Sequence, residues 1–252
     1  MTDLHPAKKF AIQLAKVWML SRSEDDCFPI DCTVIAESLG IKVHAEPIED
    51  NFEACLYIGD GLKAIIYNEN IVEPGRKNFT IAHELGHYSL HTNKPDLKCS
   101  INDLNSFGDI PPHGQDIERE ANLFAANLLM PGVDVGKQLQ GRQIDLRLIE
   151  LLSVRYGTSI TATACRVVEK HNRAAAVVFL NSKNQVEWCW KNTYFNGFFV
   201  PKGWQMNSYL DSKDAVSLDF AELGWKWSKY DLRCSAISMP YYGKRLMLVT
   251  GS

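Results

Sequence analysis

Two histidines four positions apart, in the segment His83-Glu84-Leu85-Gly86-His87, constrain this chain more than any other feature of its sequence. On an α-helix, residues i and i+4 lie one turn apart on the same face, so both imidazoles can reach a single metal ion. Glu84 borders that face and can take a proton from a water held there. The segment therefore predicts a helix with two metal ligands, His83 and His87, and a catalytic base, Glu84.

The five-residue pattern is not sufficient by itself, because it occurs by chance in about one chain of this length in a hundred. The alternative is a pair of surface histidines on an amphipathic helix. In a helical projection the apolar and ionisable side chains separate onto two arcs, with Ile81, Leu85 and Tyr88 on one and His83, Glu84, His87 and His91 on the other. This separation favours a helix that is buried on one side and lines a cleft on the other.

A catalytic zinc ion needs a third protein ligand, which leaves its fourth position for water. His91 lies on the ionisable arc, but on a straight helix it is about 12 Å along the axis from His83. That distance is too long for both residues to bind one ion. His91 is therefore expected to contact a ligand rather than the metal, or to end the helix.

The next predicted helix carries two carboxylates, Glu118 and Glu120. Periodicity places Glu118 on the buried face, together with Ala121, Asn122, Ala125 and Leu129. Glu120 points nearly the opposite way. A carboxylate on a buried face needs a compensating partner, which a metal ion supplies. Glu118 is therefore predicted to be the third ligand, and Asn122 either hydrogen-bonds a ligand or packs between helices.

Residues 79–91 (FTIAHELGHYSLH) and 118–131 (EREANLFAANLLMP) together resemble the ImmA/IrrE family of metallopeptidases. The resemblance covers about residues 30–171. It implies a zincin-like catalytic domain whose third ligand is a glutamate from the second helix, here Glu118. It also implies a protein substrate, typically a helix-turn-helix repressor that is cut at one site, and a role in stress responses or mobile-element induction. The segment 92–116 looks longer than the usual link between the two motifs, which would partly cover the cleft.

The rest of the chain predicts an α+β protein with three parts. These are a catalytic domain over 1–142, a helical, helix-turn-helix-like extension over 143–171, and a β-rich, mixed α/β domain over 172–252 that weakly resembles GAF-like sensor domains. The expected helices are 6–20, 32–39, 76–91, 117–130, 146–156 and 160–171. The expected strands are 41–48, 55–58, 62–67, 174–180, 186–191, 198–200 and 246–249.

Stabilising the transition state of peptide hydrolysis needs a hydrogen-bond donor beside the metal. Tyr88 adjoins His87, although its phase on the helix places it with the core residues. His91 and His113, which lies in the long segment before the second helix, are the other candidates. The sequence leaves the choice among these three open.

Composition argues against some partners and compartments. The formal net charge is −3 and the sequence pI about 6.2, so direct DNA binding is not expected even though Thr161, Thr163, Arg166 and Lys170 lie on the second helix of the extension. No apolar run is long enough to cross a membrane, and the N-terminus lacks the layout of a secretion signal. Seven scattered cysteines without a CxxC pair favour a reducing cytoplasm.

The sequence as a whole predicts a cytoplasmic endopeptidase that uses zinc, or else manganese, to make a limited cut in a protein substrate. The alternative is a regulator that binds DNA or a partner protein, or a toxin-like member of a toxin–antitoxin pair, with a structural or vestigial metal site. The two readings differ in what Glu84 must do, because only the enzyme needs its carboxylate as a base.

Overall fold

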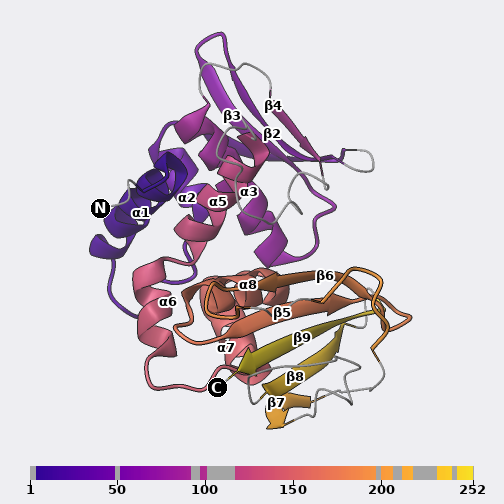
Figure 1. The fold of residues 1–252 in the computed structure, drawn as a ribbon. Helices are drawn as coiled ribbons and strands as arrows, with labels where there is room; N and C mark the ends of the chain where they lie inside the picture. Colours follow the sequence, from indigo (N-terminus) through magenta and orange to yellow (C-terminus); the bar gives the residue numbers. More distant parts are fainter. Residues whose placement is uncertain are drawn as a thin grey trace. The chain divides into compact units, whose positions relative to one another are not determined.

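The computed structural model describes residues 4–48, 52–91, 97–100, 117–196, 200–206, 212–217, 232–239 and 243–251. The chain divides into two compact units, one made of 1–131 with 154–159 and the other of 132–153 with 160–252. Each unit combines helices with one sheet, which confirms the α+β class (Figure 1). The predicted boundaries at 142/143 and 171/172, and the likeness to GAF-like domains, stay predictions.

The first unit contains a four-stranded sheet with the order β1-β3-β2-β4. The strands are β1 (Lys42–Glu46), β2 (Phe52–Gly59), β3 (Leu62–Asn68) and β4 (Leu97–Ser100). β2 and β3, which contain the strands expected at 55–58 and 62–67, form a hairpin, and β1 joins β3 in parallel. The hairpin turns at Asp60 and Gly61, which have φ angles of 50° and 75°. Such positive φ values suit glycine, and aspartate is one of the few other residues that adopts them readily.

The helices described beside this sheet are α1 (Pro6–Leu20), α2 (Cys32–Ser38), α3 (Pro74–Leu90) and α5 (Ile117–Leu129). α3 packs on β2 and β3 and also on α5, and α5 packs on α1 (Figure 1). α3 is therefore enclosed by other elements, and every residue from Thr80 to His87 is buried. These eight residues include the histidines, whose helix packs against α5, and the expectation that this face of α3 lines a cleft stays a prediction.

Helix α1 has the predicted bounds, but its inner face differs from the one that large apolar residues suggest. Phe10 is 48% exposed and Val17 is 65% exposed, whereas a stripe with helical spacing is buried, consisting of Ala7, Ala11, Ala15 and Trp18. Alanine side chains are short, so this stripe lets α1 lie close against α5. Side-chain size at the helix contact, rather than hydrophobicity alone, decides which face turns inward.

The second unit is built on an antiparallel sheet with the order β6-β5-β9-β8-β7. Its elements are α6 (Gly132–Leu139), most of α7 (Leu146–Tyr156), whose last three residues belong to the first unit, α8 (Ile160–Lys170), β5 (Ala175–Leu180), β6 (Val186–Lys191), β7 (Ser212–Ser217), β8 (Leu232–Met239) and β9 (Lys244–Gly251). α8 packs on β5 and β6. Every residue of β5 is buried, as is expected for a strand at the centre of a small domain.

The two helices predicted over 146–156 and 160–171 are confirmed as α7 and α8, but α8 does not expose the polar residues expected of a DNA-reading helix. Thr163 and Arg166 are buried, and the Arg166 Nη1 atom lies 2.7 Å from Glu169 Oε2. A helix-turn-helix role for this pair stays a prediction without support from these side chains. Residues 198 and 199 of the strand expected over 198–200 lie outside the described residues.

In the part of the chain that the structure describes, no helix is both long enough and apolar enough to cross a membrane.

Candidate metal centre

The centre is positioned by the close crossing of α3 and α5 at Gly86. A Cβ atom at this position would lie 3.0 Å from Ala121 Cα and 3.2 Å from Phe124 Cβ. These distances are shorter than normal van der Waals contact, so only glycine allows the two helix backbones to approach this closely. Glu118 lies one turn before Ala121 on α5, and the crossing therefore places it over the histidines of α3.

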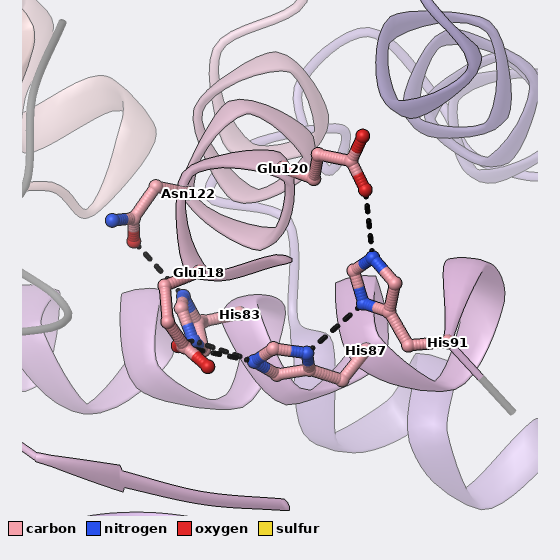
Figure 2. A network of polar contacts seen from close by, with 6 residues as sticks. All are labelled: His83, His87, His91, Glu118, Glu120 and Asn122. Atoms are coloured by element: carbon pink, nitrogen blue, oxygen red, sulfur yellow. Dashed lines mark hydrogen bonds and ion pairs between the residues drawn. The ribbon is translucent and has the colours of Figure 1, made fainter. Parts of the chain in front are cut away.

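His83, His87 and Glu118 converge, and each offers one ligand atom within 4.8 Å of the other two (Figure 2). The Nε2 atoms of the two histidines are 3.0 Å apart. Glu118 Oε2 lies 3.0 Å from His83 Nε2 and 3.3 Å from His87 Nε2. Zinc–ligand bonds of about 2.0–2.1 Å in a tetrahedral site place neighbouring donor atoms about 3.3 Å apart. The three atoms thus have nearly the spacing of three corners around one ion.

The partner of His83 determines which of its two ring nitrogens carries the proton. The His83 Nδ1 atom lies 2.9 Å from Asn122 Oδ1, an amide oxygen that can only accept a hydrogen bond. His83 therefore donates from Nδ1. In its neutral form the Nε2 atom then carries a lone pair, which points to the meeting point of the three ligand atoms.

His87 is held in the same tautomer through a longer chain of contacts (Figure 2). The His91 Nε2 atom lies 2.8 Å from Glu120 Oε2, and the Nδ1 atoms of His87 and His91 are 3.0 Å apart. Because the carboxylate accepts from His91 Nε2, the His91 Nδ1 atom is an acceptor and His87 donates to it from Nδ1. The lone pair of His87 Nε2 therefore also points to the meeting point.

Three lone-pair atoms that face one another at about 3 Å repel each other unless a cation lies between them. Burial lowers the pKa of His87 below its ordinary value, which favours the unprotonated ring that binds a metal ion. Burial raises the pKa of Glu118, but its contacts with the ring nitrogens of His83 and His87 outweigh burial and hold this pKa well below its usual range. Two imidazoles and one carboxylate form a donor set that fits a divalent metal ion.

The chain of contacts extends beyond the three ligands to the beginning of α1. Glu120 Oε1 lies 3.5 Å from the Nε2 atom of His5. His5 is the N-cap of α1, where its Nδ1 atom accepts a hydrogen bond from the backbone NH of Ala7. Glu120 was predicted to point away from the site, and it does so only in part, because it contacts the histidine that holds His87.

The remaining predicted site residues are placed as follows. Glu84 is fully buried on α3, next to His83 in the sequence. The Tyr88 hydroxyl accepts a hydrogen bond from Lys63 Nζ at 2.8 Å, on the side of the helix that faces β3. Both ring nitrogens of His91 have partners, His87 and Glu120. His113 lies outside the described residues.

Comparison with known proteins agrees with the motifs that carry this centre. The family model of the IrrE N-terminal-like domain, Peptidase_M78, matches residues 36–168, which is more than half of the chain and includes both α3 and α5. Comparison with curated proteins found no match. Among solved structures, a Mycobacterium tuberculosis transcriptional regulator matches with a TM-score of 0.56 and 14% identity, over 98% of this chain and 77% of that one. At this identity the likeness shows a shared fold alone.

Proposed function

The chain belongs to the Peptidase_M78 family of IrrE N-terminal-like domains, and from this premise we propose that it is a metal-dependent endopeptidase. The observation that carries the proposal is the convergence of His83 Nε2, His87 Nε2 and Glu118 Oε2 between two crossing helices. These three atoms hold the metal ion, and Glu84 is the catalytic base. The family membership predicted from the two motifs is confirmed, whereas the roles of the individual residues are part of the proposal.

The donor set favours zinc, because two imidazole nitrogens and one carboxylate oxygen are common ligands of catalytic zinc ions. Manganese also accepts this mixed set of nitrogen and oxygen donors. When bound, a zinc ion lowers the pKa of water at its open position to about 7 and polarises the carbonyl of the scissile peptide bond.

Glu84 performs the proton transfers in the proposed reaction. Its carboxylate takes a proton from the attacking water and then gives this proton to the leaving amine when the peptide bond breaks. Because Glu84 is adjacent to His83 on a helix that is buried around its whole circumference, its backbone position is held rigidly relative to the metal ligands. A fully buried carboxylate is also screened from bulk water, which strengthens its interaction with a nearby cation.

Asn122, His91 and Glu120 are positioning residues in this proposal. Asn122 holds the tautomer and ring orientation of His83. His91 does the same for His87, and Glu120 in turn orients His91. Partners of this kind raise the affinity of a site for its metal because the ligands do not have to reorganise on binding.

These contacts also bear on which residue stabilises the developing oxyanion. His91 is unsuited to that task, since both of its ring nitrogens are engaged. Tyr88 is hydrogen-bonded to Lys63 rather than to any of the three ligand residues. The third candidate from the sequence, His113, lies outside the described residues and stays a prediction for this role.

The proposed substrate is a protein that is cut at one site, and by family resemblance a helix-turn-helix repressor whose cleavage relieves repression during stress or mobile-element induction. This choice rests on the resemblance of the two motifs and on the buried state of the ligands. A centre in which His83, Glu84 and His87 are fully buried does not suit indiscriminate digestion of unfolded chains.

The proposal is tested by comparing protein N-termini in cells that express the wild-type chain or its Glu84→Gln variant. Glutamine has nearly the same shape but cannot act as a base, so the variant is expected to retain the metal while new N-termini appear only with the wild type. The same few N-termini in both samples would overturn the enzyme and favour a regulator that acts by binding.

A further inference from the structure

The second unit contains a pocket that the proposed peptidase chemistry does not use. Its volume is about 750 Å³, within the range of pockets that hold small molecules. The lining comes from the end of α6 and the loop after it, the end of α8 and the turn after it, and the adjoining ends of β8 and β9. All of these segments belong to the second unit, so the pocket exists independently of how that unit sits relative to the metal centre.

The charged residues described in the lining of this pocket are all basic. Of the fourteen described residues that line it, four are arginine or lysine, namely Arg142, Lys170, Arg173 and Arg233, and none of the fourteen is aspartate or glutamate. In the whole chain acidic residues outnumber arginine and lysine, 30 to 27. The basic lining is therefore not a consequence of composition, and it raises the local concentration of anions.

The contacts of these four side chains differ. Lys170 Nζ lies 3.3 Å from Glu169 Oε1, so its charge is partly offset. Arg233 donates to the amide oxygen of Gln143 at 3.1 Å, which orients the guanidinium. Among the described residues, no carboxylate forms an ion pair with Arg142 or Arg173.

A simpler role for basic residues at this place is to cap the C-terminal carbonyl groups of α8, where positive charge is favourable. Part of this role falls to the buried Asn192, whose side-chain amide nitrogen lies 3.1, 3.2 and 2.7 Å from the backbone oxygens of Val168, His171 and Arg173. Asn192 therefore binds one carbonyl group in the last turn of α8 and two in the turn after it, so part of the capping at this helix end does not depend on the basic side chains.

The lining also limits the kind of anion. Among the described residues that line it, the large apolar ones are Leu139 and Ile144, and none is phenylalanine, tyrosine or tryptophan. The imidazole of His171 is the one ring among these residues, and its Nδ1 atom accepts a hydrogen bond from the backbone NH of Arg173, so the described lining offers little surface for stacking a nucleobase. Arginine guanidinium groups, by contrast, match the oxygens of phosphate with paired hydrogen bonds. A pocket is also the wrong shape for the rod of a nucleic-acid duplex, which needs an extended basic surface.

We propose that this pocket binds a compact polyanion with two or more phosphate groups, held by Arg142, Arg173, Arg233 and Lys170. The phosphate groups of the ligand contact the basic side chains. Polyphosphates and small metabolites with several phosphate groups can both make these contacts. The proposal is independent of the peptidase activity, because it uses no residue of the metal centre.

The test is calorimetric titration of the full chain with inorganic triphosphate, using the Arg142→Gln/Arg173→Gln double variant. Both side chains are exposed, so the variant is expected to fold. The Lys183→Gln/Lys202→Gln double variant is the control, since it removes two exposed positive charges of the same unit away from the pocket. All proteins keep the same metal centre, so chelation of its metal by triphosphate contributes equally to each titration.

We expect saturable binding that weakens with added salt, falls at least tenfold in the arginine variant, and changes less than twofold in the control. Absence of binding to the wild type, or equal weakening in the two variants, would overturn the proposal. So would a DNA duplex that binds more tightly than triphosphate and loses affinity in the arginine variant, because the basic residues would then form a nucleic-acid surface.

Discussion

Each imidazole of the metal centre depends on a partner that settles which of its nitrogens carries the proton. Asn122 does this for His83, and His91 does it for His87. Without these partners a neutral histidine would have to select the required tautomer at the moment of metal binding. The centre therefore includes two further side chains, Asn122 and His91, besides the three proposed ligands, and Glu120 orients His91.

At this scale the first prediction concerns metal content. Wild-type protein is expected to retain about one zinc or manganese ion per chain, and His83→Ala and Glu118→Ala to lose it, because two ligands do not hold a catalytic ion. Elemental mass spectrometry of native protein measures the content. Glu37→Ala, which removes an exposed carboxylate from α2, is the control and should retain the metal. Metal retained by both ligand variants would contradict the assignment.

A second residue-scale prediction separates positioning by Glu120 from simple packing. Glu120→Ala is expected to weaken zinc binding by about 10- to 100-fold, because His91 then loses the acceptor that fixes its tautomer. Glu120→Gln should lose less affinity, since its amide oxygen still accepts from His91 Nε2. Competition with a chromophoric chelator measures both constants. Equal losses in the two variants would show that the carboxylate charge, rather than its hydrogen bond, is what matters.

At the scale of elements, the centre is a product of one helix crossing. α3 supplies His83 and His87 on successive turns, and α5 supplies Glu118, so the distance between the helix axes decides whether three ligands or two can bind. Gly86 sets that distance by leaving no side chain between α3 and Ala121. The glycine inside the motif therefore contributes to the centre by setting the distance between the three proposed ligands.

This view predicts a specific result for Gly86→Ala. The added methyl group would lie 3.0 Å from the Ala121 backbone, so α5 must shift and carry Glu118 away from the histidines. We expect a lower melting temperature and metal affinity reduced at least tenfold. Gly136→Ala is the matched control, because this exposed glycine also lies in a helix and its added Cβ would meet nothing within 4 Å. The control should be stabilised by about 0.5–1 kcal/mol, and metal binding by Gly86→Ala at the wild-type level would contradict the argument.

At the scale of the whole molecule, buried thiols connect stability to pH. Burial raises the pKa of Cys165, Cys189 and Cys234 to about 12, from an ordinary value near 9. A folded-state pKa above the unfolded one means that the unfolded chain loses these protons first as pH rises. The contribution of these groups to stability is therefore complete below pH 9 and declines as pH rises from about 9 to about 12.

The midpoint of urea unfolding, followed by tryptophan fluorescence, is accordingly expected to fall between pH 8 and pH 10. Cys234→Ala should have a lower midpoint at pH 8, because it leaves a small cavity at a buried site. Its decline between the two pH values should be smaller than that of the wild type, since one titrating thiol is gone. A decline of the same size in both proteins would assign the alkaline sensitivity to other groups.

Local sequence determined much of this protein. The i, i+4 spacing places His83 and His87 on one helix face, and helical periodicity selects Glu118 rather than Glu120 as the carboxylate brought to them. Most helices, the hairpin of β2 and β3, and strands β5 and β6 agree with the sequence patterns, and the family follows from two motifs. These features depend on neighbours within a few residues, so a single chain reveals them.

Tertiary structure alone decided the rest. The contact between His91 and Glu120 was missed because it depends on where α5 crosses α3, although His91 continues the row of His83 and His87 by another four residues. The inner face of α1 is its alanine stripe because α5 lies close to it. α6 is absent from the expected helices, because Pro131 and Gly132 are residues that commonly end a helix, whereas here Gly132 begins the next one. Each of these features depends on the distance and angle between elements, which are set by packing and not by the spacing of residues along one element.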